Sequence, residues 1–273
     1  MFKEKLENLR KNGALIHNIT NYVTVNDVAN ILLASGAAPI MADEIDEAAD
    51  ITSICGGLAI NIGTLNRRTI PAMFAAGKKA NELRHMVVLD PVGAGASTLR
   101  TETATGLLHE IRFTAIRGNI SEIKAIAAGT SGTQGVDANV ADKVTDENLE
   151  NAVSFVKSFS RETGALIIAT GAIDLVADKD TAYVIRNGHP DMSRITGTGC
   201  MLSALVAAYL TANPDDLLTA AAAAVVAMGF AGETARARMT EKDGNGAFRQ
   251  YLLDAVYAMT GEALEAGAKY ALR

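Results

Sequence analysis

The 273-residue sequence has no tryptophan, few aromatic residues and only two cysteines, and each scarcity excludes a class of protein. Surfaces that stack nucleic-acid bases need aromatic side chains, which make up only 5% of this chain. Cys55 and Cys200 have no paired spacing, which argues against a disulfide framework or a zinc site. A reducing cytoplasm suits such a chain best.

An excess of positive charge is also missing. The formal net charge of −6 argues against nucleic acid or an anionic membrane as the main partner. Histidine-based metal sites are not indicated either, because His85, His109 and His189 are scattered and show no metal-ligand spacing. We expect His17 to make structural hydrogen bonds and not to act as a base.

Long apolar runs suited to a leader or a membrane span are scarce. The first 13 residues, MFKEKLENLRKNG, predict a charged amphipathic helix without the apolar stretch of a signal peptide. The most apolar long segment, residues 217–232, is rich in alanine and short for a membrane span. We therefore expect it to form a buried helix of a soluble protein.

Short hydrophobic runs alternate with helical patterns over the first two thirds of the chain. The runs are nearly continuous in hydrophobicity, as expected for strands that are covered on both faces. In one of the helical segments between them, Thr24 and Asp27 suggest a capping box. The alternation predicts a three-layer α/β/α fold with a mostly parallel central sheet. The expected strands are residues 14–19, 38–41, 58–63, 86–90, 114–118 and 165–171.

This alternation stops after residue 171. Residues 174–188 predict an antiparallel hairpin at the edge of the sheet, and we expect only helices after it. Residues 127–139 are rich in glycine and polar side chains, which predicts a loop or flap. No linker or internal repeat interrupts the chain, so residues 1–273 are expected to form a single domain.

Polar residues follow several of the expected strands. In sheets of this kind, ligands bind at the carboxyl ends of the strands. Asp90 ends one strand and Thr170 ends another. Arg117 and Asn119 end a third, and Glu122 lies in the helix that begins there. Each of these is common turn chemistry by itself, but carboxylates and an arginine together indicate metal-assisted phosphoryl transfer.

A glycine-rich turn in RITGTGCMLSALVAAYL (194–210) precedes an apolar helix. Its glycines let backbone N–H groups converge and the helix adds its dipole, a combination that suits an anion such as phosphate. Cys200 would stand in the first turn of the helix, where the positive potential favours a thiolate. A tight loop with a small buried cysteine fits the local sequence equally well.

Taken together, seven segments of the chain resemble the hydroxyethylthiazole kinases, a family of the ribokinase-like superfamily. The resemblance extends over nearly the whole sequence. HNITNYVT and GTGCM are its specific parts, whereas the Asn-x-x-Glu pattern and the glycine-rich turn are shared across the superfamily. The segments are residues 17–30, 35–43, 58–66, 89–95, 116–123, 168–176 and 195–204.

The resemblance implies phosphorylation of 4-methyl-5-(2-hydroxyethyl)thiazole in thiamine salvage, with ATP as co-substrate and Mg²⁺ as cofactor. It further implies a homotrimer with the thiazole pocket at the subunit boundaries. The residues it assigns are Met41 and Gly197 to the thiazole, Arg117 and Thr170 to ATP, Asp90, Asn119 and Glu122 to magnesium, and Cys200 to catalysis.

Cys200 departs from the wider superfamily. Most sugar-kinase relatives have an aspartate at this position, as the base that takes the hydroxyl proton. A cysteine is typical of the thiazole kinases and supports the narrower assignment, but it leaves the identity of the base open. The residues of the specific block to which no role is assigned are Asn18, Thr20 and Asn21.

Several of the assigned residues have structural alternatives. Met41 would suit the core equally well, and Thr170 and Asp90 would suit turns. Glu122 would be favoured in the first turn of a helix by the dipole alone.

Other functions fit the same fold. A nucleotide-hydrate dehydratase that uses ADP or ATP, a lyase, would share the anion turn, although the HNITNYVT block and Cys200 speak against it. A pyridoxal or hydroxymethylpyrimidine kinase would differ only in the alcohol that it binds. An enzyme with a cysteine nucleophile would need a histidine base near Cys200. A regulator without catalysis would be expected to lack Asp90 and Glu122.

Overall fold

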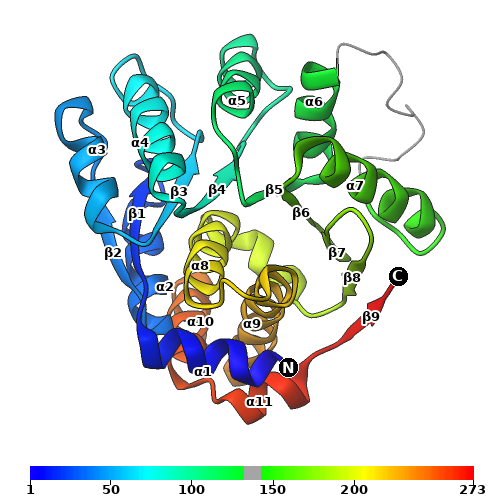
Figure 1. The fold of residues 1–273 in the computed structure, drawn as a ribbon. Coiled ribbons are helices and arrows are strands. Elements are labelled where there is room, and N and C mark those ends of the chain that lie inside the picture. The colour runs from blue at the N-terminus through cyan, green and yellow to red at the C-terminus, as the bar shows by residue number, and fades with distance from the viewer. Residues whose placement is uncertain (132–142) are drawn as a thin grey trace.

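The computed structural model describes residues 1–131 and 143–273, which build a nine-stranded sheet with helices on both faces (Figure 1). The order is β2-β1-β3-β4-β5-β6-β7-β8-β9, and the six strands from β2 to β6 are parallel whereas the last three pair antiparallel. The predicted mostly parallel three-layer fold is confirmed. The strands are β1 (Leu15–Ile19), β2 (Ala38–Met41), β3 (Gly57–Asn61), β4 (Met86–Asp90), β5 (Ala115–Asn119), β6 (Leu166–Thr170), β7 (Asp174–Ala177), β8 (Ala182–Ile185) and β9 (Tyr270–Leu272).

The helices form one layer on each side of the sheet (Figure 1). One layer contains α3 (Ile45–Ile54), α4 (Thr69–Leu83), α5 (Thr98–Glu110), α6 (Ile120–Ser131) and α7 (Leu149–Thr163). The other contains α1 (Phe2–Asn12), α2 (Val25–Ser35), α8 (Thr198–Ala212), α9 (Leu217–Arg238), α10 (Asn245–Ala258) and α11 (Gly261–Gly267). A short 3₁₀ helix, η1 (Pro190–Arg194), precedes α8.

The continuous hydrophobicity of the strands follows from these two layers. All five residues of β3 are buried. Leu58 and Ile60 pack in the core between the sheet and α3–α7, whereas Ala59 packs in the core on the α8 side. Because successive side chains point to opposite faces, a strand covered on both faces needs apolar residues at nearly every position.

The alanine-rich segment forms most of α9. This helix is long and apolar enough to cross a membrane by length and composition, but 72% of its most apolar window is buried inside the protein. Its hydrophobicity is therefore explained by the core. The prediction of a buried helix over residues 217–232 is confirmed.

Two expectations about the last third of the chain are wrong. Tyr270–Leu272 form β9, which pairs with β8, so the hairpin is not at the edge and helices are not the only elements after it. Three residues are too short to give a periodic signal, and their pairing depends on the fold. The ring of Tyr270 packs against Phe2 and Tyr183, at centroid distances of 5.0 and 5.6 Å.

Two local predictions also need correction. Thr24 precedes α2, but the capping box does not form, because Thr24 donates to Asn21 Oδ1 and the Asp27 carboxylate pairs with Arg249. The first part of the expected loop over residues 127–139 is helical, since α6 continues to Ser131. The rest of that segment lies outside the described residues.

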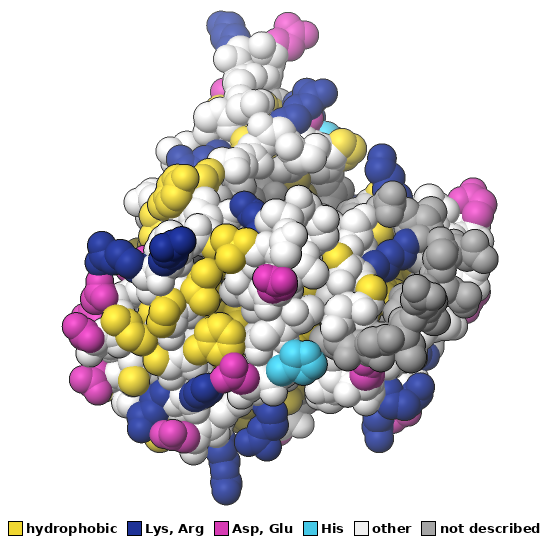
Figure 2. Space-filling view, turned by 90° about the horizontal axis from the view of Figure 1, so that it is seen from above, with side chains coloured by type: hydrophobic (Ala, Val, Ile, Leu, Met, Phe, Trp, Pro, Cys, Tyr) yellow, Lys and Arg dark blue, Asp and Glu magenta, His cyan; other side chains and the backbone are white. Residues whose placement is uncertain are grey.

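Basic and acidic side chains are interspersed on the face of the molecule that Figure 2 shows, and apolar side chains gather in one area among them. The charge is thus mixed on this face. A surface that binds a polyanion by charge alone would instead gather basic side chains into a patch.

Candidate active site

Strands β3 to β6 end side by side at one edge of the sheet, and each carries a polar side chain at its last residue. The register places Asn61 of β3 beside Asp90 of β4, and Asn119 of β5 beside Thr170 of β6. The expectation that Asp90, Asn119 and Thr170 end neighbouring strands is confirmed. This edge is the one at which ligands bind in open α/β sheets.

Asp90 lies at the centre of the cluster and is only 1% exposed. Its Oδ2 accepts hydrogen bonds from Asn61 Nδ2 at 2.8 Å and from Ser203 Oγ at 2.7 Å. Arg117 Nη1 lies 3.5 Å from the same oxygen, while Oδ1 has no hydrogen-bond partner. Burial raises the pKa of the Asp90 carboxyl, and the Arg117 guanidinium acts against that rise. Arg117 is thus the charge that balances a buried acid.

Arg117 joins three of the predicted elements. Its Nη2 donates to Thr170 Oγ1 at 2.7 Å, and its side chain is 12% exposed. The guanidinium also lies against the glycine-rich turn, because a Cβ on Gly199 would stand only 2.5 Å from Nη1. Only glycine therefore fits this position of the turn with Arg117 in place.

Cys200 lies in the first turn of α8 and is partly exposed. Its Sγ accepts hydrogen bonds from Asn21 Nδ2 and Asn61 Nδ2, both at 3.3 Å. Asn21 Nδ2 also donates to Asn61 Oδ1 at 2.9 Å. Asn21 thus donates to the sulfur and to Asn61, and Asn61 donates to the sulfur and to Asp90. All four amide N–H bonds are used, which fixes the position of the thiol.

Sequence reasoning missed two members of this cluster. Asn61 was given no role, although an amide that closes the apolar strand LAIN was a signal that could have marked it. Ser203, one turn after Cys200, had no such signal, because a serine in an apolar helix is unremarkable. Asn21, left without a role, is a hydrogen-bond donor to the thiol.

The two residues assigned to the thiazole border α2. Gly197 is the N-cap of α8, and a Cβ there would stand 3.0 Å from Thr24 Cγ2. The first N–H groups of α8 have no partner within their own helix, as an anion site requires. Met41 ends the edge strand β2 and packs, partly buried, at the border of the core on this side of the sheet.

Asn119 and Glu122 hold each other in place. Asn119 Oδ1 accepts from the Glu122 N–H at 2.9 Å, and Glu122 Oε2 accepts from the Asn119 N–H at 2.8 Å. Their oxygens are of the hard type that Mg²⁺ prefers. Within residues 1–131 and 143–273, no three His, Cys, Asp or Glu side chains converge to hold a metal. The pair therefore fits an ion that keeps waters and phosphates as ligands.

The remaining sulfur and ring nitrogens have structural roles. Cys55 is buried, and burial raises the pKa of its thiol to about 11. His17 is fully buried, and its Nε2–H donates to the Ala42 carbonyl at 2.7 Å. Its Nδ1 lies 2.9 Å from Thr52 Oγ1, and burial lowers the pKa of the ring. The structural role predicted for His17 is confirmed.

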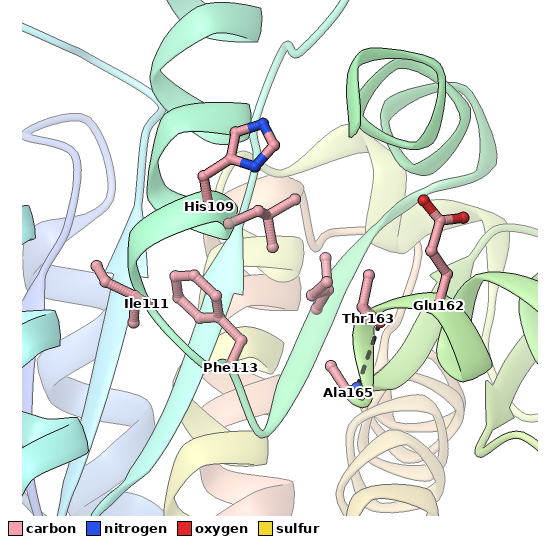
Figure 3. Close-up of a pocket in the computed structure, with 8 residues that line it drawn as sticks. His109, Ile111, Phe113, Glu162, Thr163 and Ala165 are labelled. Atoms are coloured by element: carbon pink, nitrogen blue, oxygen red, sulfur yellow. Dashed lines mark hydrogen bonds between the residues drawn. The ribbon is translucent and has the colours of Figure 1, made fainter. Parts of the chain in front are cut away.

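A cavity of about 250 Å³ lies at the opposite edge of the sheet, near the amino ends of β5 and β6 (Figure 3). Ile111, Phe113, His109 and Glu162 are among the residues that line it. None of the residues assigned to substrate, nucleotide or metal takes part in its wall. The cavity is therefore separate from the candidate active site.

Comparison with solved structures defines the class of the fold. The hydroxyethylthiazole kinase of Pyrococcus horikoshii OT3 matches with a TM-score of 0.88 at 34% identity, covering 100% of this chain and 98% of that one. A pyridoxal kinase from Staphylococcus aureus, solved with AMP-PCP and pyridoxal, matches with a TM-score of 0.60 over 96% of this chain and 98% of that one. At 16% identity it shows the shared fold alone. The chain has the ribokinase-like α/β fold of these kinases.

Sequence comparison then gives the family. Residues 6–262 match the model of the hydroxyethylthiazole kinase family, and the chain belongs to that family. The hydroxyethylthiazole kinase of Clostridium acetobutylicum is 60% identical and covers 99% of both chains. That of Desulfovibrio desulfuricans is 46% identical, over 97% of this chain and 95% of its own. These matches favour a thiazole kinase over the dehydratase and over the pyridoxal or hydroxymethylpyrimidine kinases.

Proposed function

We propose that this protein transfers the γ-phosphoryl group of ATP to the hydroxyl of 4-methyl-5-(2-hydroxyethyl)thiazole, with Mg²⁺, in thiamine metabolism. The observation that carries the proposal is the position of Arg117, which connects Asp90, Thr170 and the turn at Gly199. This arrangement supplies what phosphoryl transfer needs most, which is positioning and neutralisation of charge. Family membership supplies the acceptor.

Arg117, Thr170 and the start of α8 would bind the phosphates of ATP. The guanidinium is held by Thr170 Oγ1, and α8 begins beside it with N–H groups that have no partner within the helix. Donors fixed in this way stabilise the charge that spreads over the phosphoryl oxygens in the transition state. Gly197, at the same turn, and Met41 would contact the thiazole, for which the thioether of Met41 offers a soft apolar surface.

Asn119 and Glu122 would hold the magnesium ion through its waters. When bound, Mg²⁺ neutralises phosphate charge and orients the triphosphate. Asp90 would act on the site through its charge, because Asn61, Ser203 and Arg117 surround one of its carboxylate oxygens.

Cys200 would accept the proton of the substrate hydroxyl. The hydroxyl oxygen bonds to the γ-phosphorus, the bridging oxygen departs with ADP, and the proton moves to a Cys200 thiolate. Asn21 and Asn61 support this role because their amides hold Sγ in place. A base adds only a modest factor in a loose transition state, so a thiolate is a sufficient proton acceptor here.

A cytoplasmic homotrimer with the thiazole pocket at its subunit boundaries completes the proposal. Support comes from the side chains that follow β1: Tyr22 is 78% exposed and Val23 is 54% exposed, although both are apolar. They lie in the HNITNYVT block and follow β1, the neighbour of the edge strand β2 that ends at Met41. Closed symmetric assemblies commonly bury such patches.

An ATP-consumption assay with three alcohols tests the proposed function. Purified protein with Mg²⁺ is expected to phosphorylate the thiazole alcohol with a higher kcat/KM than hydroxymethylpyrimidine or pyridoxal. Omitting Mg²⁺ should abolish turnover. Faster transfer to hydroxymethylpyrimidine or pyridoxal would contradict the proposed substrate. Dehydration of a nucleotide hydrate without phosphorylation would show a lyase instead.

A further inference from the structure

Arg100 occupies a position that its charge alone does not favour. It lies in the first turn of α5, where the helix dipole is positive and a cation is destabilising. The side chain is half-buried, and no carboxylate lies within ion-pair distance of it among the residues that the structure describes. Its partners must therefore be of another kind.

The guanidinium bonds instead to two loops of the candidate active site. Nη1 donates to the Val92 carbonyl and Nη2 donates to the Gly63 carbonyl, both at 2.6 Å. Gly63 follows β3 and its N–H donates to Asn61 Oδ1, whereas Val92 follows β4 and Asp90. The planar fork thus connects the loops after two neighbouring strands.

The contact with Val92 involves a peptide group that is also held from its other end. The Val92 carbonyl accepts from Arg100, and the N–H of the same peptide, on Gly93, donates to Glu122 Oε1 at 2.8 Å. A Cβ on Gly93 would stand 2.6 Å from Arg100 Nη1, so glycine is what lets the guanidinium approach. Arg100 and Glu122 thereby fix the orientation of one peptide plane between them.

We infer that Arg100 is a positioning residue for phosphoryl transfer. It orients the Val92–Gly93 peptide, whose N–H donates to Glu122 Oε1. It also binds the carbonyl of Gly63, whose N–H donates to Asn61, and Asn61 contacts Cys200. The proton-accepting and metal-binding halves of the site are aligned before ATP binds. The inference rests on the proposed role of Glu122, and the experiment below separates the two.

The test compares Arg100→Gln and Arg100→Lys with Arg112→Gln as the matched control. Arg112 is exposed and lies just after α5, so its variant removes the same charge without touching either loop. Arg100→Gln is expected to lower kcat/KM for ATP about 10- to 100-fold and to raise the Mg²⁺ concentration needed for half activity. Arg100→Lys keeps the charge but replaces the two nitrogens of the planar fork with a single nitrogen, so it should recover only part of the loss.

Hydrogen exchange of the Gly93 amide, followed by NMR without ATP or Mg²⁺, is the readout that does not depend on activity. In Arg100→Gln and Arg100→Lys this amide should exchange at least about tenfold faster, while amides in β5 and the melting temperature change little. Unchanged Gly93 exchange would overturn the inference.

A double-mutant cycle with Glu122→Gln adds a second criterion. If Arg100 acts through Glu122, the double variant should lose little more activity than the worse single variant. Fully multiplicative losses would overturn the inference. A Glu122→Gln variant with unaltered Mg²⁺ dependence would contradict the metal role of Glu122, whereas Gly93 exchange would still decide the role of Arg100.

Discussion

At Cys200, the surroundings of the thiol decide which substitutions the site can tolerate. Asn21 and Asn61 each direct an amide N–H at the sulfur. A carboxylate or hydroxyl oxygen can accept the same two bonds, but a methyl group cannot. The site is therefore built around a hydrogen-bond acceptor atom, which can be either sulfur or oxygen.

Cys200→Asp is accordingly expected to remain active, because a carboxylate accepts a proton without first having to be deprotonated. Cys200→Ser should be slower, and Cys200→Ala slower still, within the 10²- to 10⁴-fold range of general-base catalysis. The measurement is kcat with saturating ATP and thiazole alcohol. A dead Cys200→Asp together with an unimpaired Cys200→Ala would show that position 200 does not hold the base.

Asp174 gives the fold a pH-dependent stability. It begins β7, its Oδ1 accepts from the Gly171 N–H at 2.8 Å, and burial raises the pKa of its carboxyl to about 7. An acid with a raised pKa binds its proton more tightly in the folded state. Its contribution to the free energy of unfolding is therefore full below about pH 4 and is lost as pH rises through about 7.

Asp174→Asn should remove this dependence while keeping the acceptor for Gly171. Relative to the parent chain, we expect its free energy of unfolding to rise by about 2 kcal/mol between pH 5 and pH 8. Urea unfolding at these two pH values measures the difference. Asp180→Asn, on the exposed turn of the same hairpin, serves as the control, and a pH-independent difference for Asp174→Asn would contradict the prediction.

At the scale of elements, the N-terminus of α8 is where the parts of the site meet. The helix places Cys200 and Ser203 one turn apart, so that one contacts the Asn21–Asn61 amides and the other contacts Asp90. Arg117 reaches the same turn from β5. The close approach of the Arg117 side chain to the start of the helix depends on the absence of a side chain at Gly199.

Gly199→Val should therefore damage activity more than any change at Cys200. Its Cβ would stand 2.5 Å from Arg117 Nη1 and would push the guanidinium away from Asp90 and Thr170. We expect kcat/KM for ATP to fall further than in Cys200→Ala, by more than about 10⁴-fold. Gly246→Val in α10, where a Cβ would meet nothing within 4 Å, is the matched control. Similar activities in the two variants would show that the turn is not part of the site.

At the scale of the whole molecule, exposed apolar side chains lie near both ends of the parallel strands. Tyr22 and Val23 follow β1 at the active-site edge of the sheet. Ile54, at the end of α3, is 65% exposed but lies at the other edge, where β3 begins. The proposed trimer interface, which would complete the thiazole pocket, explains why Tyr22 and Val23 are exposed in a single chain. It does not explain the exposure of Ile54.

Light scattering on the purified protein should give the mass of a trimer. Val23→Asp should shift this mass toward the monomer and reduce activity at low protein concentration, since it places a charge in a buried interface. Ile54→Asp introduces the same charge outside the interface and should leave both unchanged. A monomeric parent protein with full activity would contradict the trimer.

The sequence by itself determined most of the elements and the end of the parallel strands that carries the site. β2 and β4 have the bounds that were predicted, and the other predicted strands differ by one or two residues at their ends. Hydrophobic periodicity is a local property, because each strand or helix must match its own covered faces. Asp90, Arg117, Asn119 and Thr170 were found because parallel strands bring their carboxyl ends together.

Only the tertiary structure decided which of these residues touch and what surrounds them. Asp27 pairs with Arg249, 222 residues away, instead of capping its own helix. Asn61 and Ser203 meet at Asp90 from separate elements, and β9 exists only because the chain returns to β8. Such contacts depend on register and packing between elements distant in the sequence. Local periodicity carries no information about them, and they set the geometry on which catalysis depends.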